Sequence, residues 1–244
     1  MASSKSAKDP KKQQWKRSNP GVKRTVSFQS NAAKFAATHH FDSISKSLFD
    51  LDVVARARSK SVVAGSFDFK GAMEAVDREL GGLDQEISAR NEQIKALLRD
   101  HKIDELVEYE NPWVREVSIK TPYTLTALNV FVDFDKLNAY LDTAYLYRLT
   151  EKATVDELSN GLAAKIRDLA KSLHIRATSA IHELKVSHSA SVEKGQPDDI
   201  AGTALAEIEN DGAADAADAA DAADAGATDQ LVSQPSSEAL DTVN

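Results

Sequence analysis

The stretch 21–30, GVKRTVSFQS, decides how the rest of the sequence is interpreted. Its side chains alternate, with Lys23, Thr25 and Ser27 standing between Val22, Arg24, Val26 and Phe28. Alternation of period two predicts a β-strand over 22–28 that presents one row of side chains to each face. The polar row has two interpretations. It lies against a nucleic acid, or it is the half-buried edge of an ordinary domain.

Two helices are predicted directly after this strand. Ser30 and Asn31 are suited to cap a helix over AAKFAATHHF, and Asp42 or Ser43 to cap a second one over ISKSLFDLDVVARARS. The apolar positions of the second run keep helical spacing: Ile44, Leu48, Leu51 and Val54. The order is therefore strand, helix, helix.

A longer helical seam follows, with steps of three and four residues. Its members are Met73, Val76, Leu80, Leu83, Ile87, Arg90, Ile94 and Leu97. Such steps are typical of a packed hairpin or bundle helix. Gly81 and Gly82 interrupt the seam, and each glycine costs a helix interior about 1 kcal/mol. We expect a break there, with two helices near 71–80 and 83–109.

A second strand is predicted in VREVSIKTP, because β-branched Val114, Val117 and Ile119 recur in a short run that Pro122 ends. Two helices joined by a tight link around 133–135 should follow, which repeats the order strand, helix, helix. A capping box at 154–157 opens a further helix, whose apolar stripe is Leu158, Leu162, Ile166, Leu169 and Leu173, and we expect a last short helix with Ile181 and Leu184.

Charge divides the chain into three parts. Residues 1–24 carry eight Lys or Arg and one acid, a net +7, whereas residues 189–244 carry thirteen acids and one Lys, a net −12. We expect a disordered basic arm at 1–20, a mainly helical core at 21–186, and a disordered acidic Ala/Asp-rich tail at 187–244. The predicted fold class is mainly α with a short β-ribbon and a helical bundle or hairpin.

The composition argues against several classes of protein. The chain has no cysteine, no signal peptide and no apolar run long enough for a membrane helix, so we expect a cytoplasmic protein with no membrane partner. It has no GxGxxG, P-loop, nucleophile elbow or HExxH motif. Asp133 and Asp135 are explained more simply by helix capping than by acid/base chemistry. We expect no enzyme, no cofactor and no metal site.

Nucleic-acid binding is one function that the polar residues permit, although taken alone they fit an amphipathic edge strand beside a solvated Lys-rich tail slightly better. A two-stranded ribbon is narrow enough to enter a major groove, and an arm rich in Lys and Arg can reach flanking phosphates. The predicted DNA-binding residues are Lys23, Arg24, Thr25 and Ser27 on the first strand, Arg115, Ser118 and Lys120 on the second, and Lys11, Lys12, Lys16 and Arg17 in the arm. Glu116 would be repelled by phosphate. The two strands could pair within one chain or each with a second copy, and the pattern does not choose between these pairings.

Several segments in this order resemble the AcaB-like transcriptional regulators of conjugative plasmids and integrating conjugative elements. They are RTVSFQSNAAKFAATHHF, MEAVDRELGGLDQEI and NPWVREVSIKTPYTLTALNVFVDFDKLNAYLDTAYLYRLT, followed by a closing basic helix. The resemblance spans about residues 22 to 185 and is best marked at 130–149, where FVDFDKL is similar to a recurring segment of the family.

The resemblance implies a dimeric DNA-binding activator of transfer genes with a fold similar to ribbon-helix-helix proteins. The predicted fold class is then mainly α with a short β-ribbon, a ribbon-helix-helix-like element plus a helical bundle or hairpin, and the core at 21–186 contains this DNA-binding element. In such proteins the ribbon comes from two subunits, and its outward side chains read the major groove. We expect double-stranded DNA and a second copy of the chain as partners, with RNA polymerase as a further candidate. The alternative is a helical scaffold or adaptor of a conjugative element that does not bind DNA.

Overall fold

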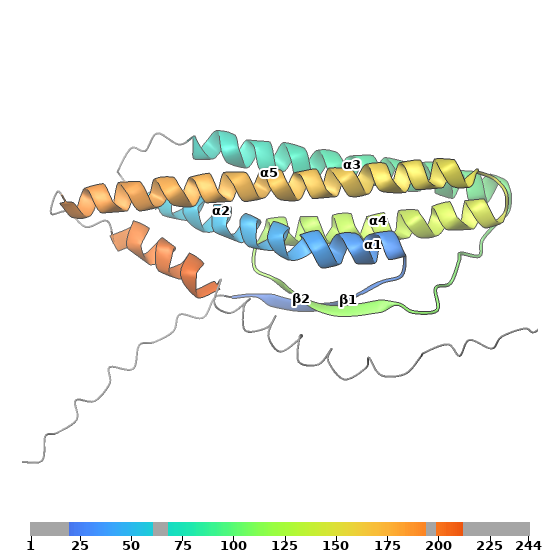
Figure 1. Ribbon diagram of the computed structural model, residues 1–244, viewed down its shortest axis with the longest axis horizontal. Helices are drawn as coiled ribbons and strands as arrows, with labels where there is room; N and C mark the ends of the chain where they lie inside the picture. Colours follow the sequence, from blue (N-terminus) through green and yellow to red (C-terminus); the bar gives the residue numbers. More distant parts are fainter. Residues whose placement is uncertain (1–19, 61–67, 194–198, 212–244) are drawn as a thin grey trace, which may run out of the picture.

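The computed structural model describes residues 20–60, 68–193 and 199–211. Its elements follow in the order β1 (Val22–Phe28), α1 (Asn31–Ala36), the π-helical turn η1 (Ala37–Phe41), α2 (Asp42–Lys60), α3 (Phe69–Asp100), β2 (Trp113–Ile119), α4 (Pro122–Leu146) and α5 (Lys152–Glu193). A further helix covers 199–211. Long helices lie side by side and a two-stranded antiparallel ribbon runs along one side of them (Figure 1). The predicted fold class is confirmed.

The first helical part of the chain is continuous, because α1, η1 and α2 follow one another without a gap. Ser30 caps its start: the Ala33 amide donates to Ser30 Oγ at 3.2 Å. The buried rings of Phe41 and Phe131 then meet edge to face, with their centroids 5.5 Å apart. This contact fixes η1 against α4.

Helix α3 runs unbroken from Phe69 to Asp100, so the predicted break at Gly81 and Gly82 is wrong. Leu80 and Leu83 on either side of the glycines are buried, and their packing outweighs the low helix propensity of glycine. The seam also drifts by one position, since Arg90 is exposed and Asn91 is buried in its place.

Helix α4 is likewise a single helix, and the predicted link at 133–135 does not exist. Phe134 and Asp135 are both buried on its inward face. A buried aspartate in a helix interior is rare unless it has partners. Its partners lie at the start of α1, as described below.

Helix α5 begins at Lys152, two residues before the predicted capping box, and continues to Glu193. The separate short helix expected at Ile181 and Leu184 is therefore wrong, since both residues belong to α5. The expected start of an unfolded tail at residue 187 therefore lies too early, because 187–193 belong to α5 and 199–211 form another helix. Ala201, Ala204 and Ile208 of that helix join the hydrophobic core. Their burial explains why this acidic stretch is ordered; residues beyond 211 lie outside the described part of the chain.

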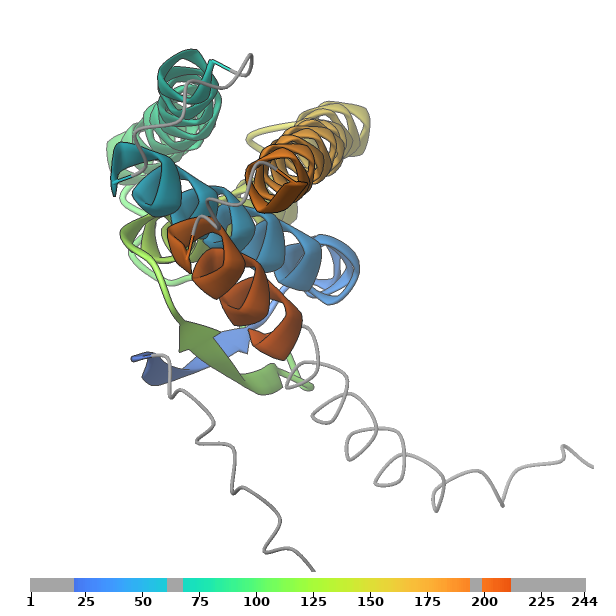
Figure 2. The same ribbon diagram turned by 90° about the vertical axis from the view of Figure 1, so that its left-hand side faces the viewer.

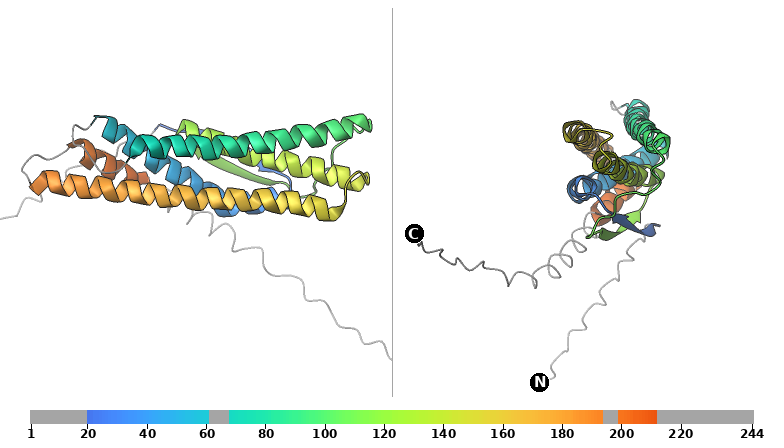
Figure 3. Two further views of the ribbon diagram at one scale, coloured as in Figure 1. Left: turned by 90° about the horizontal axis from the view of Figure 1, so that it is seen from above. Right: turned by 90° about the vertical axis from the view of Figure 1, so that its right-hand side faces the viewer.

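The helices form an elongated bundle. Helix α3 packs mainly on α4, and α2 mainly on α5. The end-on view places the ribbon on one side of the bundle, with helix 199–211 close to it (Figure 2). The view from above shows α3 and α5 running along the opposite side (Figure 3). Within the described ranges, no helix is long and apolar enough to cross a membrane.

Candidate functional site

The ribbon consists of β1 and β2 of the same chain, paired antiparallel. Val22 lies opposite Ile119, Thr25 opposite Glu116, and Phe28 opposite Trp113. This resolves the pairing that the sequence left open. It also differs from the ribbon of two subunits that the resemblance implied, because β2 takes the position beside β1.

The two faces of the ribbon differ sharply in burial. On the inner face Phe28 and Val117 are buried, and the ring of Phe28 stacks on Trp113 at 5.9 Å. The opposite face, which we call the outer face, has six side chains: Lys23, Thr25, Ser27, Val114, Glu116 and Ser118. All six are exposed. Among the described residues, nothing covers this surface, whereas the inner face packs on the bundle beside which the ribbon lies (Figure 1).

The outer face is polar but close to neutral. Lys23 Nζ donates to Glu116 Oε1 at 2.7 Å, and both side chains are more than half exposed. Gln29 Nε2 donates to Ser27 Oγ at 3.3 Å. Hydroxyl groups that can donate or accept hydrogen bonds make up the rest of its polar surface.

The structure brings together some of the predicted site residues and separates others. Four share the outer face: Lys23, Thr25, Ser27 and Ser118. Arg24 is exposed, but alternation places it on the inner side of β1. Lys11, Lys12, Lys16 and Arg17 lie outside the described residues.

Arg115 and Lys120 are engaged inside the molecule. Arg115 lies on the inner side of β2, where its Nη2 donates to both carboxylate oxygens of Asp42, the nearer at 2.6 Å. Lys120 follows β2, and its Nζ pairs with Asp211 Oδ1 at 2.5 Å. Neither cation therefore lies on the outer face with Lys23. Both instead tie the ribbon to helices.

Asp135 is the residue that fixes the junction between β1 and α1. Its carboxylate accepts the Gln29 amide at 2.9 Å and the Ser30 amide at 2.8 Å. These amides open the turn into α1, where a negative charge is also favoured by the helix dipole. Sequence reasoning assigned Asp135 to helix capping. The signal that could have identified its role is its place on the buried stripe of α4, next to Phe134 and one turn before Asn138.

Titratable groups with shifted pKa values lie away from the ribbon. The Arg176 guanidinium donates to Glu79 and lowers the pKa of that carboxyl. Burial, followed by a hydrogen bond to Asp142, raises the pKa of Tyr109. Burial lowers the pKa of His40, and the nearby His39 and Arg167 lower it further. In the described part of the chain, no cluster of three His, Cys, Asp or Glu could hold a metal ion.

The comparisons with known proteins bear on the fold. A scan against models of protein families finds no match, and a search of curated proteins finds none either. Among solved structures, the chain is similar to selenomethionine-containing AcaB from uropathogenic E. coli. The two share 19% sequence identity and a TM-score of 0.60, over 77% of this chain and 91% of that chain. This likeness shows that the fold is AcaB-like.

Proposed function

We propose that this chain, with its AcaB-like fold, is a sequence-specific DNA-binding regulator that activates conjugative transfer genes. In this proposal the outer face of the ribbon enters the major groove. The observation that carries the proposal is that face itself: six side chains, five of them polar, stand exposed on a ribbon whose other side is anchored in the core. We propose a binding role in the cytoplasm and no catalytic one.

The chemistry of the outer face suits base edges better than phosphates. Thr25, Ser27 and Ser118 can donate to or accept from a base, Lys23 can donate to guanine, and Glu116 can accept from cytosine N4. The exposed Lys23–Glu116 pair contributes about 0–1 kcal/mol, so exchanging it for base contacts costs little. Phosphate contacts would come from the basic residues of the arm.

A second copy of the chain is the proposed protein partner, and the free edge of β1 is the proposed place of contact. The first four residues of β1 are all exposed, whereas β2 is more buried and lies closer to α4. Antiparallel self-pairing of β1 about Thr25 puts Lys23 of one copy opposite Ser27 of the other. The same pairing of β2 would oppose two Glu116 carboxylates, which is destabilising.

The dimer is tested by mass in solution. Sedimentation equilibrium should give twice the chain mass, and Ser27→Lys should shift the equilibrium toward monomer, because it opposes two ammonium groups across the new pairing. Val114→Lys adds the same charge on β2 and serves as the matched control. A monomer at all accessible concentrations, or equal effects of the two variants, contradicts pairing through β1.

DNA binding is tested by selecting ligands from a library of random duplexes. We expect enrichment of a defined sequence. With about six phosphates neutralised per dimer, the slope of log affinity against log salt should be near −5. Thr25→Ala should erode the sequence preference, whereas Ser88→Ala, which removes an exposed hydroxyl on α3, should leave it unchanged. A library that yields no enriched sequence contradicts the proposal.

The arm should act differently from the ribbon. Deleting residues 1–20 should flatten the salt slope while the sequence preference persists, because phosphate contacts carry affinity and no sequence information. Loss of the preference on this deletion would move the reading surface from the ribbon to the arm.

A scaffold or adaptor of a conjugative element is the second candidate. The observation in its favour is a group of exposed apolar side chains at one end of the bundle: Leu106, Tyr145, Leu146 and Tyr147. Hydrogen bonds from Val107 to Thr143 and from Tyr109 to Asp142 hold the two segments together. Exposed apolar patches mark protein interfaces. In a regulator this end of the bundle would contact RNA polymerase. In a scaffold, binding another protein at this end would be the main function, without DNA binding.

A further inference from the structure

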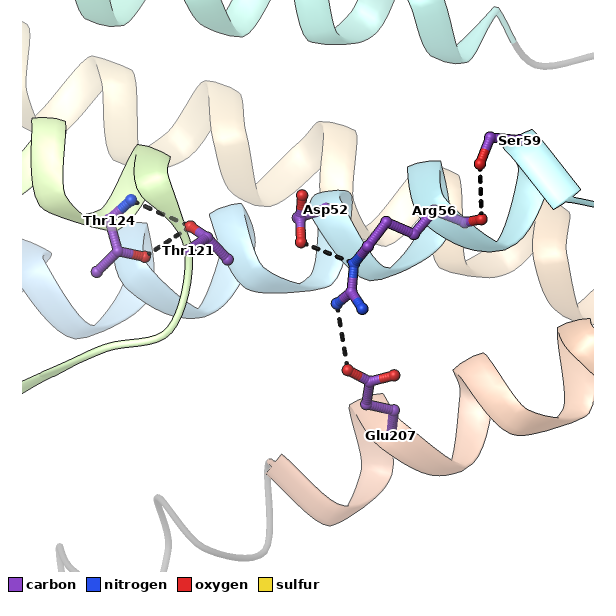
Figure 4. Close-up of polar contacts among 6 residues, drawn as sticks. All are labelled: Asp52, Arg56, Ser59, Thr121, Thr124 and Glu207. Atoms are coloured by element: carbon purple, nitrogen blue, oxygen red, sulfur yellow. Dashed lines mark hydrogen bonds and ion pairs between the residues drawn. The ribbon is translucent and has the colours of Figure 1, made fainter. Parts of the chain in front are cut away.

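Helix 199–211 is docked beside the ribbon by both apolar and polar contacts. Ala201, Ala204 and Ile208 are buried in the core. Arg56 of α2 joins α2 to helix 199–211. Its Nε donates to Asp52 of α2 at 3.0 Å, and its Nη2 donates to Glu207 of helix 199–211 at 3.2 Å (Figure 4). The helix therefore has a defined position, and so does the point from which the chain continues.

The C-terminal end of this helix is fixed to the end of β2. The side chain of Asp211 is only 4% exposed and that of its partner, Lys120, is 18% exposed. The Lys120 ammonium also lies 5.8 Å from the centroid of the Phe49 ring. Asp211 is thus held beside Lys120, which directly follows Ile119, the last residue of β2.

Exposed cations lie close to this point. The register places Lys23 opposite Ser118 and Arg24 opposite Val117, two and three residues before Lys120. The basic arm joins β1 at Gly21. A Cβ at this position would lie 3.2 Å from Ser118 Oγ and 3.7 Å from Lys120 Cγ, so Gly21 packs against the end of β2. The basic arm and the segment after Asp211 therefore leave the folded core at the same end of the ribbon.

The segment 212–244 has the opposite charge to the basic arm, which joins this end of the ribbon. Its 33 residues contain no Lys, Arg or His. They contain seven carboxylates: Asp215, Asp218, Asp221, Asp224, Asp229, Glu238 and Asp241. Fully extended, a chain of this length reaches roughly 110 Å, so it can cover the whole ribbon.

We propose that segment 212–244 binds in cis to the cations at this end of the ribbon, Lys23, Arg24 and those of the arm, and competes there with DNA phosphates. This inference rests on the proposed function. Because the segment is attached beside the cations that it binds, its effective concentration at them is on the order of millimolar, which makes weak ion pairs significant. A specific site adds base contacts and displaces the segment, whereas a nonspecific duplex has only phosphate contacts to offer. The segment therefore sharpens discrimination between the two.

The first experiment measures binding to a nonspecific duplex as salt is varied, with the full chain and with a chain ending at Asp211. That truncation retains the docked helix. If the segment occupies about two cations, its removal should steepen the slope of log affinity against log salt by about 1.8. The truncated chain should then bind about tenfold more tightly at 50 mM than the full chain, if the two agree near 200 mM salt. Equal affinities at 50 mM contradict the inference.

Matched full-length variants separate charge from length. Asn at positions 215, 218, 221 and 224 removes four carboxylates, and should reproduce most of the gain in nonspecific affinity. Asn in place of Ala216, Ala219, Ala222 and Ala225 changes the same segment without changing its charge, and should leave the affinity as it was. Equal effects of the two sets would show that charge is not responsible, which contradicts the inference.

A second experiment needs no DNA. Because the chain has no cysteine, Ser27→Cys and Ser233→Cys allow selective labelling for energy transfer between the ribbon and the segment. Transfer should be high at 20 mM salt, fall at 500 mM salt, and be low throughout in the chain with the four Asp→Asn changes. Energy transfer that changes neither with salt nor with the four Asp→Asn substitutions contradicts the contact in cis. Absence of DNA binding in every variant would instead contradict the proposed function, and with it the competition.

Discussion

At the scale of single residues, Asp135 connects the bundle to the ribbon. One carboxylate on α4 satisfies two successive amides, Gln29 and Ser30, at the turn between β1 and α1. Ser30 Oγ in turn accepts the Ala33 amide. The direction in which β1 leaves the core is therefore set by a side chain more than 100 residues away.

Replacing Asp135 should be costly. Asp135→Ala leaves two backbone amides without their charged acceptor, and we expect the free energy of unfolding to fall by about 3 kcal/mol. Asp135→Asn retains one acceptor and should be milder. Urea unfolding measures the change, with Asp133→Ala as the control, since that side chain pairs with Lys136 near the surface. A loss below about 1 kcal/mol for Asp135→Ala would show that water replaces the carboxylate.

Sequence patterns identified residues well where the pattern is local. The cap at Ser30 and the exposed row Lys23, Thr25 and Ser27 are where the alternation and capping rules place them. The partners of Asp135, Arg115 and Lys120 could not be found in this way, because each is a contact between distant segments. Local spacing carries no information about which helix will lie opposite a charge.

At the scale of elements, helix continuity depends on packing more than on propensity. Sequence rules predicted breaks at Gly81–Gly82 and near Asp133–Asp135, and the structure has neither. In both places buried side chains flank the suspected break, so burial continues on one face. The cost of two glycines, about 2 kcal/mol, is smaller than the gain from the flanking leucines.

The glycines of α3 therefore offer room for stabilisation. A Cβ added at Gly81 or Gly82 would meet no atom within 4 Å. Gly81→Ala and Gly82→Ala should each raise the free energy of unfolding by about 0.5–1 kcal/mol, because alanine restricts the unfolded chain and favours the helix. Thermal unfolding followed by circular dichroism measures the gain. Destabilisation would mean that the helix bends at this point in solution.

Helices α3 and α5 are joined by an ion pair that depends on pH. Arg176 and Ser172 donate to Glu79, with Arg176 Nη1 at 2.8 Å and Ser172 Oγ at 3.0 Å from Glu79 Oε2. The hydrogen bond from Arg176 is the largest cause that lowers the pKa of Glu79 below its ordinary value of 4.5. The ionised carboxylate is therefore favoured by folding.

A lowered pKa makes this contribution to stability present above pH 4.5 and lost as the pH falls through the folded-state pKa. Glu79→Gln should lower the free energy of unfolding at pH 7, and the difference from the parent chain should shrink by pH 3. Unfolding by urea at both pH values checks this. Glu92→Gln, from an exposed pair with Lys95 on α3, is the matched control and should change little at either pH.

At the scale of the whole molecule, the fold class followed from the sequence, but the topology of the ribbon did not. Two strand patterns and several helical stripes were enough to predict a mainly helical protein with a ribbon. Pairing within one chain requires that α1 to α3 bring β2 back beside β1, and no local pattern encodes that return. The start of the expected tail was also placed too early, because the sequence alone does not show that 199–211 form a helix packed on the core.

The docking of helix 199–211 should be separable from the rest of the fold. Asp211→Ala leaves the largely buried Lys120 ammonium without this partner, and losing one member of a buried pair costs about 3–5 kcal/mol. We expect the loss to appear as release of this helix, since local opening requires less free energy than unfolding of the bundle. Limited proteolysis followed by mass spectrometry should show faster cleavage within 199–211 and an unchanged rate elsewhere. Glu209→Ala, on the exposed side of the same helix, should not accelerate cleavage.

The pairing of β1 with β2 has a consequence for how the chain folds. Lys23 and Glu116, which touch across the ribbon, are 93 positions apart, and long-range contacts of this kind form slowly. During synthesis the first strand must wait until the second has left the ribosome and the intervening helices have collapsed. The ribbon surface therefore cannot form before β2 has been synthesised, so a nascent or truncated chain that ends before Trp113 would contain the first helices and still lack this surface.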